Sequence, residues 1–192
     1  MLRRYEYEEK KEEKDVLEGI IFLTGQINES TAENVIRKII EINRKGELEF
    51  IQMIINSGGG YTTSGFSIID IMRWSKIPIY TTGIGIIASM GLLVFMTGEP
   101  GHRVITPRTS ILSHRFSAAV SGSHSQLLAF RKEEDLMHKR IVEHYLEFSN
   151  LKTRKEVEEK LLRDTEVWLT PEEAIRYGLA DIIQNDRRKI IQ

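Results

Sequence analysis

Residues 77–96, IPIYTTGIGIIASMGLLVFM, determine how the rest of the chain is interpreted, because twenty residues without a charge are long enough to cross a bilayer. Polar, glycine and proline residues interrupt the run: Pro78, Thr81, Thr82, Gly83, Gly85 and Gly91. These interruptions favour a buried strand, a glycine-relieved turn and a buried helix over a membrane span. The stretch therefore predicts the core of a folded domain.

Outward from this stretch, strand patterns and helix patterns alternate along the chain. We predict strands at 19–25, 50–56, 77–82, 102–107, 110–116 and 181–184. We predict helices from Ser30 to Gly46, within 66–75, after the bend at 85–91, at about 126–148, within 153–162 and from Pro171 to Gly178. This alternation, without an internal repeat, indicates an α/β layer architecture in one domain with a protruding long helix.

Two of these helices carry explicit end signals. Ser30 and Glu33 have the spacing of a capping box, in which each side chain satisfies a backbone N–H of the first turn. Thr170 and Glu173 repeat this spacing, and Gly178 stands where a left-handed C-cap would end the last helix.

Composition excludes several classes of function. The 192 residues include 27 basic and 28 acidic ones, so no global positive field would attract nucleic acid or an anionic membrane. The chain lacks cysteine, which excludes disulfides, a thiolate nucleophile and cysteine-based metal sites. No HExxH or calcium-loop spacing occurs, so we expect neither metal nor cofactor. Residues 1–18 mix charges and lack the apolar core of a signal peptide, which predicts a mobile, solvated segment of a cytoplasmic protein.

Ser89 lies within GIIASMG, residues 85–91, at the predicted bend between strand and helix. A serine nucleophile needs a permissive turn, a base, a group that orients the base and donors for an oxyanion. Ala88 and Gly91 are small enough to allow a tight turn, and a helix that starts here would present free N–H groups. An ordinary N-cap serine explains the same feature, and taken alone it is the simpler hypothesis.

Other candidates for chemistry are individually weak. His114 lies at the end of the strand predicted at 110–116, where a histidine is more often a satisfied polar residue than a base. The weaker histidines are His102 and His124, predicted in loops, and His138 and His144, predicted on a polar helix face. The glycines of SGGG, 57–60, could cradle a phosphate, form a simple turn or line an oxyanion hole. No GxGxxG or GxxxxGK[ST] spacing supports the phosphate hypothesis.

Taken together, four motifs resemble the ClpP-type proteolytic subunit of ATP-dependent Clp proteases: INSGGG (55–60), GIIASMG (85–91), ILSHRF (111–116) and EEAIRYGLAD (172–181). Gly60 precedes Ser89 by 29 residues, and His114 follows it by 25, spacings similar to those of that family. The resemblance covers roughly residues 18–185.

The resemblance implies a serine peptidase on a crotonase-like fold of stacked ββα units, assembled as seven-membered rings around a hidden chamber and fed by an AAA+ ATPase. It implies Ser89 as nucleophile, His114 as base, and the backbone N–H groups of Gly60 and Met90 as the oxyanion hole, with glycine at 60 because the backbone must approach the substrate. It also implies a charged segment at 1–18, a peptidase domain at 19–192 and a handle at about 115–148 that interlocks rings.

The third member of the triad stays open between two carboxylates. Counting back two residues from Trp168 gives Glu166, one methylene longer than the usual aspartate, whereas Asp164 would serve if the loop is shortened.

Departures from the family pattern concern assembly more than chemistry. Gly58 replaces the usual proline, Arg115-Phe116 the usual Gln-Pro, and Thr165 an arginine that couples active-site order to ring contact, while 117–125 is more polar than usual. These departures leave open whether the protein forms one ring or two. They also keep two other hypotheses: a catalytically silent ring subunit, and an acyl-CoA hydratase or isomerase of the same fold.

Overall fold

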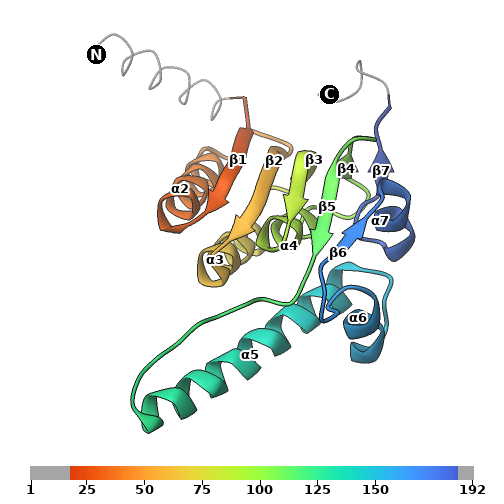
Figure 1. Cartoon of the computed structure of the whole chain (residues 1–192). Helices are drawn as coiled ribbons and strands as arrows, with labels where there is room; N and C mark the ends of the chain where they lie inside the picture. The colour runs from red at the N-terminus through yellow and green to blue at the C-terminus, as the bar shows by residue number, and fades with distance from the viewer. Residues whose placement is uncertain (1–17, 186–192) are drawn as a thin grey trace, which may run out of the picture.

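The computed structural model describes residues 18–185, so the charged segment expected at 1–18 lies, except for its last residue, outside the described residues. In the described part the strands form one sheet (Figure 1). They are β1 (Ile20–Ile27), β2 (Ile51–Gly60), β3 (Ile79–Ala88), β4 (Arg103–Ile105), β5 (Ser110–Ser113), β6 (Val167–Leu169) and β7 (Ile182–Ile183). The helices are α2 (Glu29–Lys45), α3 (Thr62–Trp74), α4 (Met90–Met96), α5 (His124–Phe148), α6 (Arg154–Lys160) and α7 (Pro171–Tyr177). The predicted α/β class is confirmed.

The sheet divides along β3. The order β1-β2-β3-β4-β7 is parallel throughout, and β4 pairs with the first half of β3, from Thr81 to Gly83. The last three residues of β3 pair instead with β5, also in parallel, and β6 then adds to β5 in antiparallel orientation. This division brings the end of β3, the end of β5 and the start of β6 to one place in the molecule.

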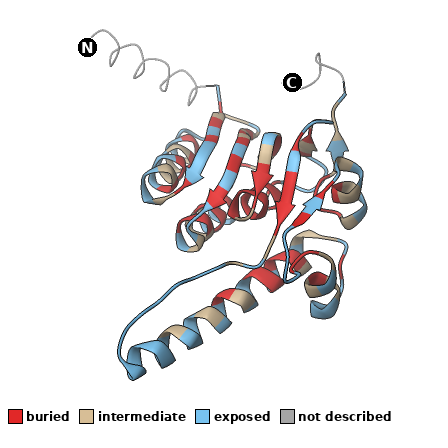
Figure 2. Ribbon diagram, in the orientation of Figure 1, coloured by how far each residue is buried: buried red, intermediate tan, exposed pale blue. Residues whose placement is uncertain are grey.

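Helices α2, α3 and α4 pack against one another and against the sheet strands β1–β3 (Figure 1). Every residue of α4 is buried, as its apolar sequence predicts. In β1 and β2, by contrast, buried residues alternate with less buried ones (Figure 2). In β1, Ile21 and Leu23 are buried, whereas Phe22 between them is 44% exposed, so only one face of this strand is covered within the described residues.

Several predicted boundaries need correction. β2 and β3 run on through their glycines, to Gly60 and Ala88, because the neighbouring strands continue to pair with them. The cap of α2 is Asn28 with Thr31, two residues earlier than the predicted Ser30–Glu33 box, and Glu33 pairs with Arg37 instead. The cap of α7 at Thr170, with Glu173 and Gly178, is confirmed.

Helix α5 extends away from the sheet, and its first half is mostly exposed, whereas its buried residues, from Met137 to Tyr145, all lie in its second half (Figures 1 and 2). The exposed part carries apolar side chains, Leu127, Leu128 and Leu136, that are 41%, 60% and 39% exposed. Among residues 18–185, no helix is long and apolar enough to cross a membrane.

Candidate active site

Ser89 occupies a strained turn between β3 and α4. Its backbone angles are φ 53° and ψ −126°, and it is the only non-glycine residue with positive φ in the described part of the chain. Such a conformation costs about 1–3 kcal/mol and persists only where the surroundings impose it. A serine held at a sharp strand-to-helix turn exposes its hydroxyl, as in the nucleophile elbow of α/β-hydrolases.

The N-cap hypothesis for Ser89 is wrong. An ordinary N-cap has an extended backbone, and its side chain accepts a hydrogen bond from the first turn. This is the case at α2, α5, α6 and α7, whose N-caps are Asn28, Ser123, Thr153 and Thr170, whereas α3 has no side-chain cap. Ser89 stands at the N-cap position of α4 but makes no such side-chain bond. Helix capping therefore leaves its hydroxyl unused.

The elbow is held by buried backbone on both sides. The Ser89 N–H donates to the Leu112 carbonyl of β5 at 2.9 Å, and the Ser89 carbonyl accepts from Leu92 and Leu93 of α4 at 3.0 and 3.2 Å. Because the Ser89 N–H is already hydrogen-bonded, the first amide beyond it is that of Met90, at the first position of α4. An N–H at this position has no acceptor within the helix.

The glycines of β2 are needed to pack against this elbow. A Cβ on Gly59, which has φ +89°, would lie 2.8 Å from both the Ala88 carbonyl oxygen and the Ser89 Cβ. A Cβ on Gly60 would collide with the backbone of Ile27 in β1. Glycine at 60 is thus required by contact with β1, a different reason from the substrate approach expected from sequence. The packing of Gly59 against the Ser89 turn was not predicted from sequence, although the glycine run was its signal.

His114 follows directly after β5 and lies beside the same pocket as Ser89. The pocket measures about 360 Å³, and Ser89, His114 and Gly60 all line it. The pairing of Ala88 with Leu112 brings the two chain segments together. Within residues 18–185 no hydrogen bond joins the Ser89 hydroxyl to the His114 ring. Catalytic hydrogen bonds are often long or poorly aligned in unliganded sites and tighten only when substrate binds.

The structure does not bring either predicted carboxylate to His114. Asp164 is exposed and pairs with Arg115 at 2.9 Å, and Arg115 also donates to the Leu162 carbonyl at 2.6 Å. Glu166 is exposed and accepts a hydrogen bond from the Trp168 indole at 3.3 Å. Neither lines the Ser89 pocket.

The strand register distinguishes the two carboxylates. β5 and β6 pair Ile111 with Leu169 and Ser113 with Val167 in antiparallel order. The ladder ends at the Ser113–Val167 pair; a further step in the same register would set His114 opposite Glu166, whereas Asp164 lies two residues beyond.

Three of the other four histidines have structural surroundings, whereas His124, predicted in a loop, is the exposed first residue of α5. His144 is 5% exposed and its Nε2 lies 2.9 Å from the Leu93 carbonyl of α4, so the predicted polar helix face is wrong at this position. Burial lowers the pKa of His144 from 6.5 to about 4. His138 pairs with Glu158, and His102 stacks on Tyr80. None of these three lines the Ser89 pocket.

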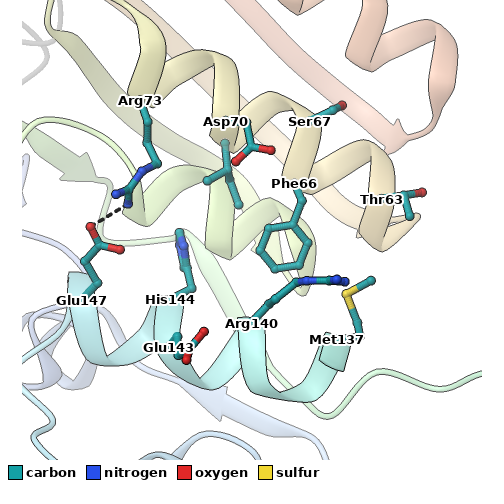
Figure 3. A pocket seen from close by; sticks show the side chains of 11 residues that line it. Thr63, Phe66, Ser67, Asp70, Arg73, Met137, Arg140, Glu143, His144 and Glu147 are labelled. Carbon is teal, nitrogen blue, oxygen red and sulfur yellow. Dashed lines mark hydrogen bonds and ion pairs between the residues drawn. The ribbon is translucent and has the colours of Figure 1, made fainter. Parts of the chain in front are cut away.

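A second, larger hollow of about 520 Å³ lies between α3 and α5 (Figure 3). Charged side chains line it, including Arg73 and Glu147, which form an ion pair at 2.6 Å. Thr63 and Met137 line both this hollow and the Ser89 pocket, so the two adjoin. Among the described residues, no cluster of three metal-ligating side chains occurs in either.

A protein-family comparison bears on this arrangement. The family model described as Clp protease matches residues 7–187. The chain belongs to the Clp protease family. The "ATP-dependent Clp protease proteolytic subunit" of Deinococcus radiodurans is 32% identical over 172 residues, covering 88% of this chain and 82% of that protein. The "ATP-dependent Clp protease proteolytic subunit 1" of Salinibacter ruber is 32% identical over 169 residues, covering 88% and 71%. The resemblance noted from the motifs is confirmed, and with it membership in a family of serine peptidases.

Proposed function

We propose that this protein is a self-compartmentalising serine endopeptidase that hydrolyses unfolded polypeptides or peptides. The observation that carries the proposal is the strained, uncapped Ser89, which lines one pocket with His114 and Gly60. A fold that imposes strain on a polar residue at a pocket gives that residue a use beyond structure.

In the proposed mechanism, the Ser89 hydroxyl attacks a peptide carbonyl while His114 accepts its proton, and the carbonyl oxygen becomes an oxyanion. The N–H groups of Met90 and Gly60 bind that oxyanion. The protonated His114 then gives its proton to the leaving amine, and an acyl-enzyme remains on Ser89. Water, activated by His114, hydrolyses the ester and restores the serine.

Of the two carboxylates, we propose Glu166 as the group that orients His114. The register of β5 and β6, continued one step beyond Ser113 and Val167, would set it opposite His114, and only the weak bond to Trp168 would have to break. Asp164 would have to leave Arg115, an ion pair that also involves the residue next to His114. Asp164 remains the alternative that mutation tests.

For assembly, we propose a homo-oligomer, a heptameric ring or double ring, that acts with an AAA+ ATPase unfoldase in the cytoplasm. The names of both relatives describe subunits of an ATP-dependent protease. The exposed apolar side chains of α5 support its role as the handle between rings, since such patches mark interaction sites. Native mass measurement tests this proposal, and a monomer would contradict it.

The chemistry is tested by a fluorophosphonate probe, with Ser89→Ala as the matched control. We expect covalent labelling of Ser89 in the assembled protein and none in the variant. An unlabelled Ser89, under conditions that label a known serine peptidase, would rule the mechanism out.

A catalytically silent ring subunit is the second candidate, favoured by the absence of a carboxylate at His114 in the described structure. Peptide cleavage separates the two functions, because only an enzyme loses activity in Ser89→Ala. An acyl-CoA hydratase or isomerase would also need an oxyanion hole, and calorimetry with acyl-CoA would detect it.

A further inference from the structure

The pocket beside Ser89 combines apolar walls with negative charge. Its apolar and aromatic lining is contributed by Tyr61, Phe116, Ala118, Phe130 and Met137. Two carboxylates of α5, Glu133 and Glu134, line it as well, and among the described residues no lysine or arginine does. Along α5, Phe130 lies three residues before Glu133 and four before Glu134, and Met137 follows the two glutamates by four and three residues. This spacing places all four side chains on one side of the helix.

The two carboxylates differ in how well they are neutralised. Glu133 forms an ion pair with Arg140 at 2.8 Å, and Arg140 lines the adjoining hollow (Figure 3). Glu134 has one ion pair within residues 18–185, with Arg131 at 3.9 Å, and Arg131 lies closer to Asp135, at 3.3 Å. The Glu134 side chain is 28% exposed, against 51% for Glu133. Glu134 therefore presents the less compensated and less screened charge to the pocket.

A side chain with an aliphatic stem and a cationic tip matches this lining. Its methylenes would pack on the aromatic and methionine walls, while its charge would approach Glu134 and the faces of the rings. An acidic side chain would meet a like charge. A purely apolar one would displace water from Glu134 without replacing its solvation, which costs free energy.

We propose that this pocket takes a lysine or arginine side chain of the substrate, adjacent to the bond that Ser89 attacks, and that Glu134 determines this specificity. The inference rests on the proposed peptidase function, because the selected residue is defined by its distance from the scissile bond.

The test compares two fluorogenic peptides that differ only in the residue before the scissile bond, lysine or leucine, with the full-length assembled protein. We expect kcat/KM to be higher for the lysine peptide, and Glu134→Gln to lower the lysine-to-leucine ratio of kcat/KM about tenfold, as removal of a partly sheltered charge pair would.

Glu133→Gln should lower this ratio less, because Arg140 already neutralises Glu133. Glu143→Gln, on the same helix but lining the other hollow, is the matched control and should leave the ratio unchanged. Preference for leucine, or a ratio unchanged in Glu134→Gln, overturns the inference.

A binding measurement separates this inference from the proposed function. In the Ser89→Ala background, we expect benzamidine to bind about tenfold more tightly than its neutral counterpart benzamide, and Glu134→Gln to abolish the difference. Equal binding of the two probes overturns the inference even where Ser89 is labelled by fluorophosphonate. Failure of that labelling overturns the peptidase function, whereas a benzamidine preference that depends on Glu134 still supports the cationic pocket.

Discussion

The Ser89 elbow and the acid segment, residues 162–166, differ in how they are held. The elbow is fixed by backbone hydrogen bonds to β5 and α4 and by glycines packed against it, and α4 is entirely buried. The acid segment is exposed from Arg163 to Glu166, and its carboxylates contact Arg115 and Trp168 in place of His114. The proposed nucleophile is therefore pre-organised, whereas the proposed acid would reach His114 only by a local rearrangement of exposed side chains.

The largest expected effect comes from removing the nucleophile. Ser89→Ala should lower kcat for peptide cleavage by about 10⁶-fold, because the remaining groups can no longer form an acyl-enzyme. Thermal unfolding should stay near that of the wild type, since the Ser89 side chain caps no helix. Residual cleavage within tenfold of wild type would show that another residue acts as the nucleophile.

The next largest effect distinguishes the two carboxylates. Glu166→Gln should lower kcat by about 10³- to 10⁴-fold, as expected for the residue that orients the histidine, without weakening the fold. Asp164→Asn is its matched control and should change kcat only a few-fold, because the exposed Arg115 pair contributes little. If the two variants exchange these effects, Asp164 is the acid and the ladder argument is wrong.

Breaking the packing of the elbow should cost stability. Gly59→Ala introduces a Cβ 2.8 Å from the Ser89 turn at a positive φ, so we expect about 2–4 kcal/mol of destabilisation in urea unfolding. Gly58→Ala is the control, since its Cβ would have nothing within 4 Å, and it should change stability by less than about 0.5 kcal/mol. Equal stability of the two variants would mean that the elbow is not braced by β2.

The smallest effect is a pH dependence carried by His144, which joins α5 to α4. Burial lowers its pKa from 6.5 to about 4, an effect that the Leu93 carbonyl and Glu147 oppose and Arg73 assists. Folding thus favours the neutral ring, so this contribution is complete above pH 6.5 and is lost as the pH falls toward 4.

The shift corresponds to at most about 3 kcal/mol. Unfolding free energies measured between pH 7 and pH 4 should fall less in His144→Gln than in the wild type. Parallel curves for the two proteins would contradict the assignment.

The sequence predicted those features that depend on local pattern. The strand–helix alternation, the caps of α7 and the bend at Ser89 follow from apolar spacing and from glycine, proline and threonine at particular positions. β2 and β3 were predicted too short because glycine weakens a strand by local preference, and only the neighbouring strands show that pairing continues. His144 was misplaced because a histidine and its charged neighbours look alike in a helical pattern, while the Leu93 carbonyl that accepts a hydrogen bond from its ring comes from another helix.

The site itself was predictable in part. The resemblance to the Clp protease family predicted that Ser89, His114 and Gly60 would meet, and they line one pocket. The roles of Gly59 and Glu134 were not predicted, because each depends on which chain segment lies against it in three dimensions. The partners of Asp164 and Glu166 likewise depend on side-chain positions in an exposed segment, which no sequence pattern determines.

The most direct test of this account is a crystal structure of the protein with a peptide phosphonate bound covalently to Ser89. We predict that the Ser89 elbow keeps its positive φ and its bond to the Leu112 carbonyl, while the Glu166 carboxylate moves within about 3 Å of a His114 ring nitrogen. A structure in which the elbow rearranges, or in which His114 binds Asp164 or no carboxylate at all, would contradict the distinction between a fixed nucleophile and a movable acid.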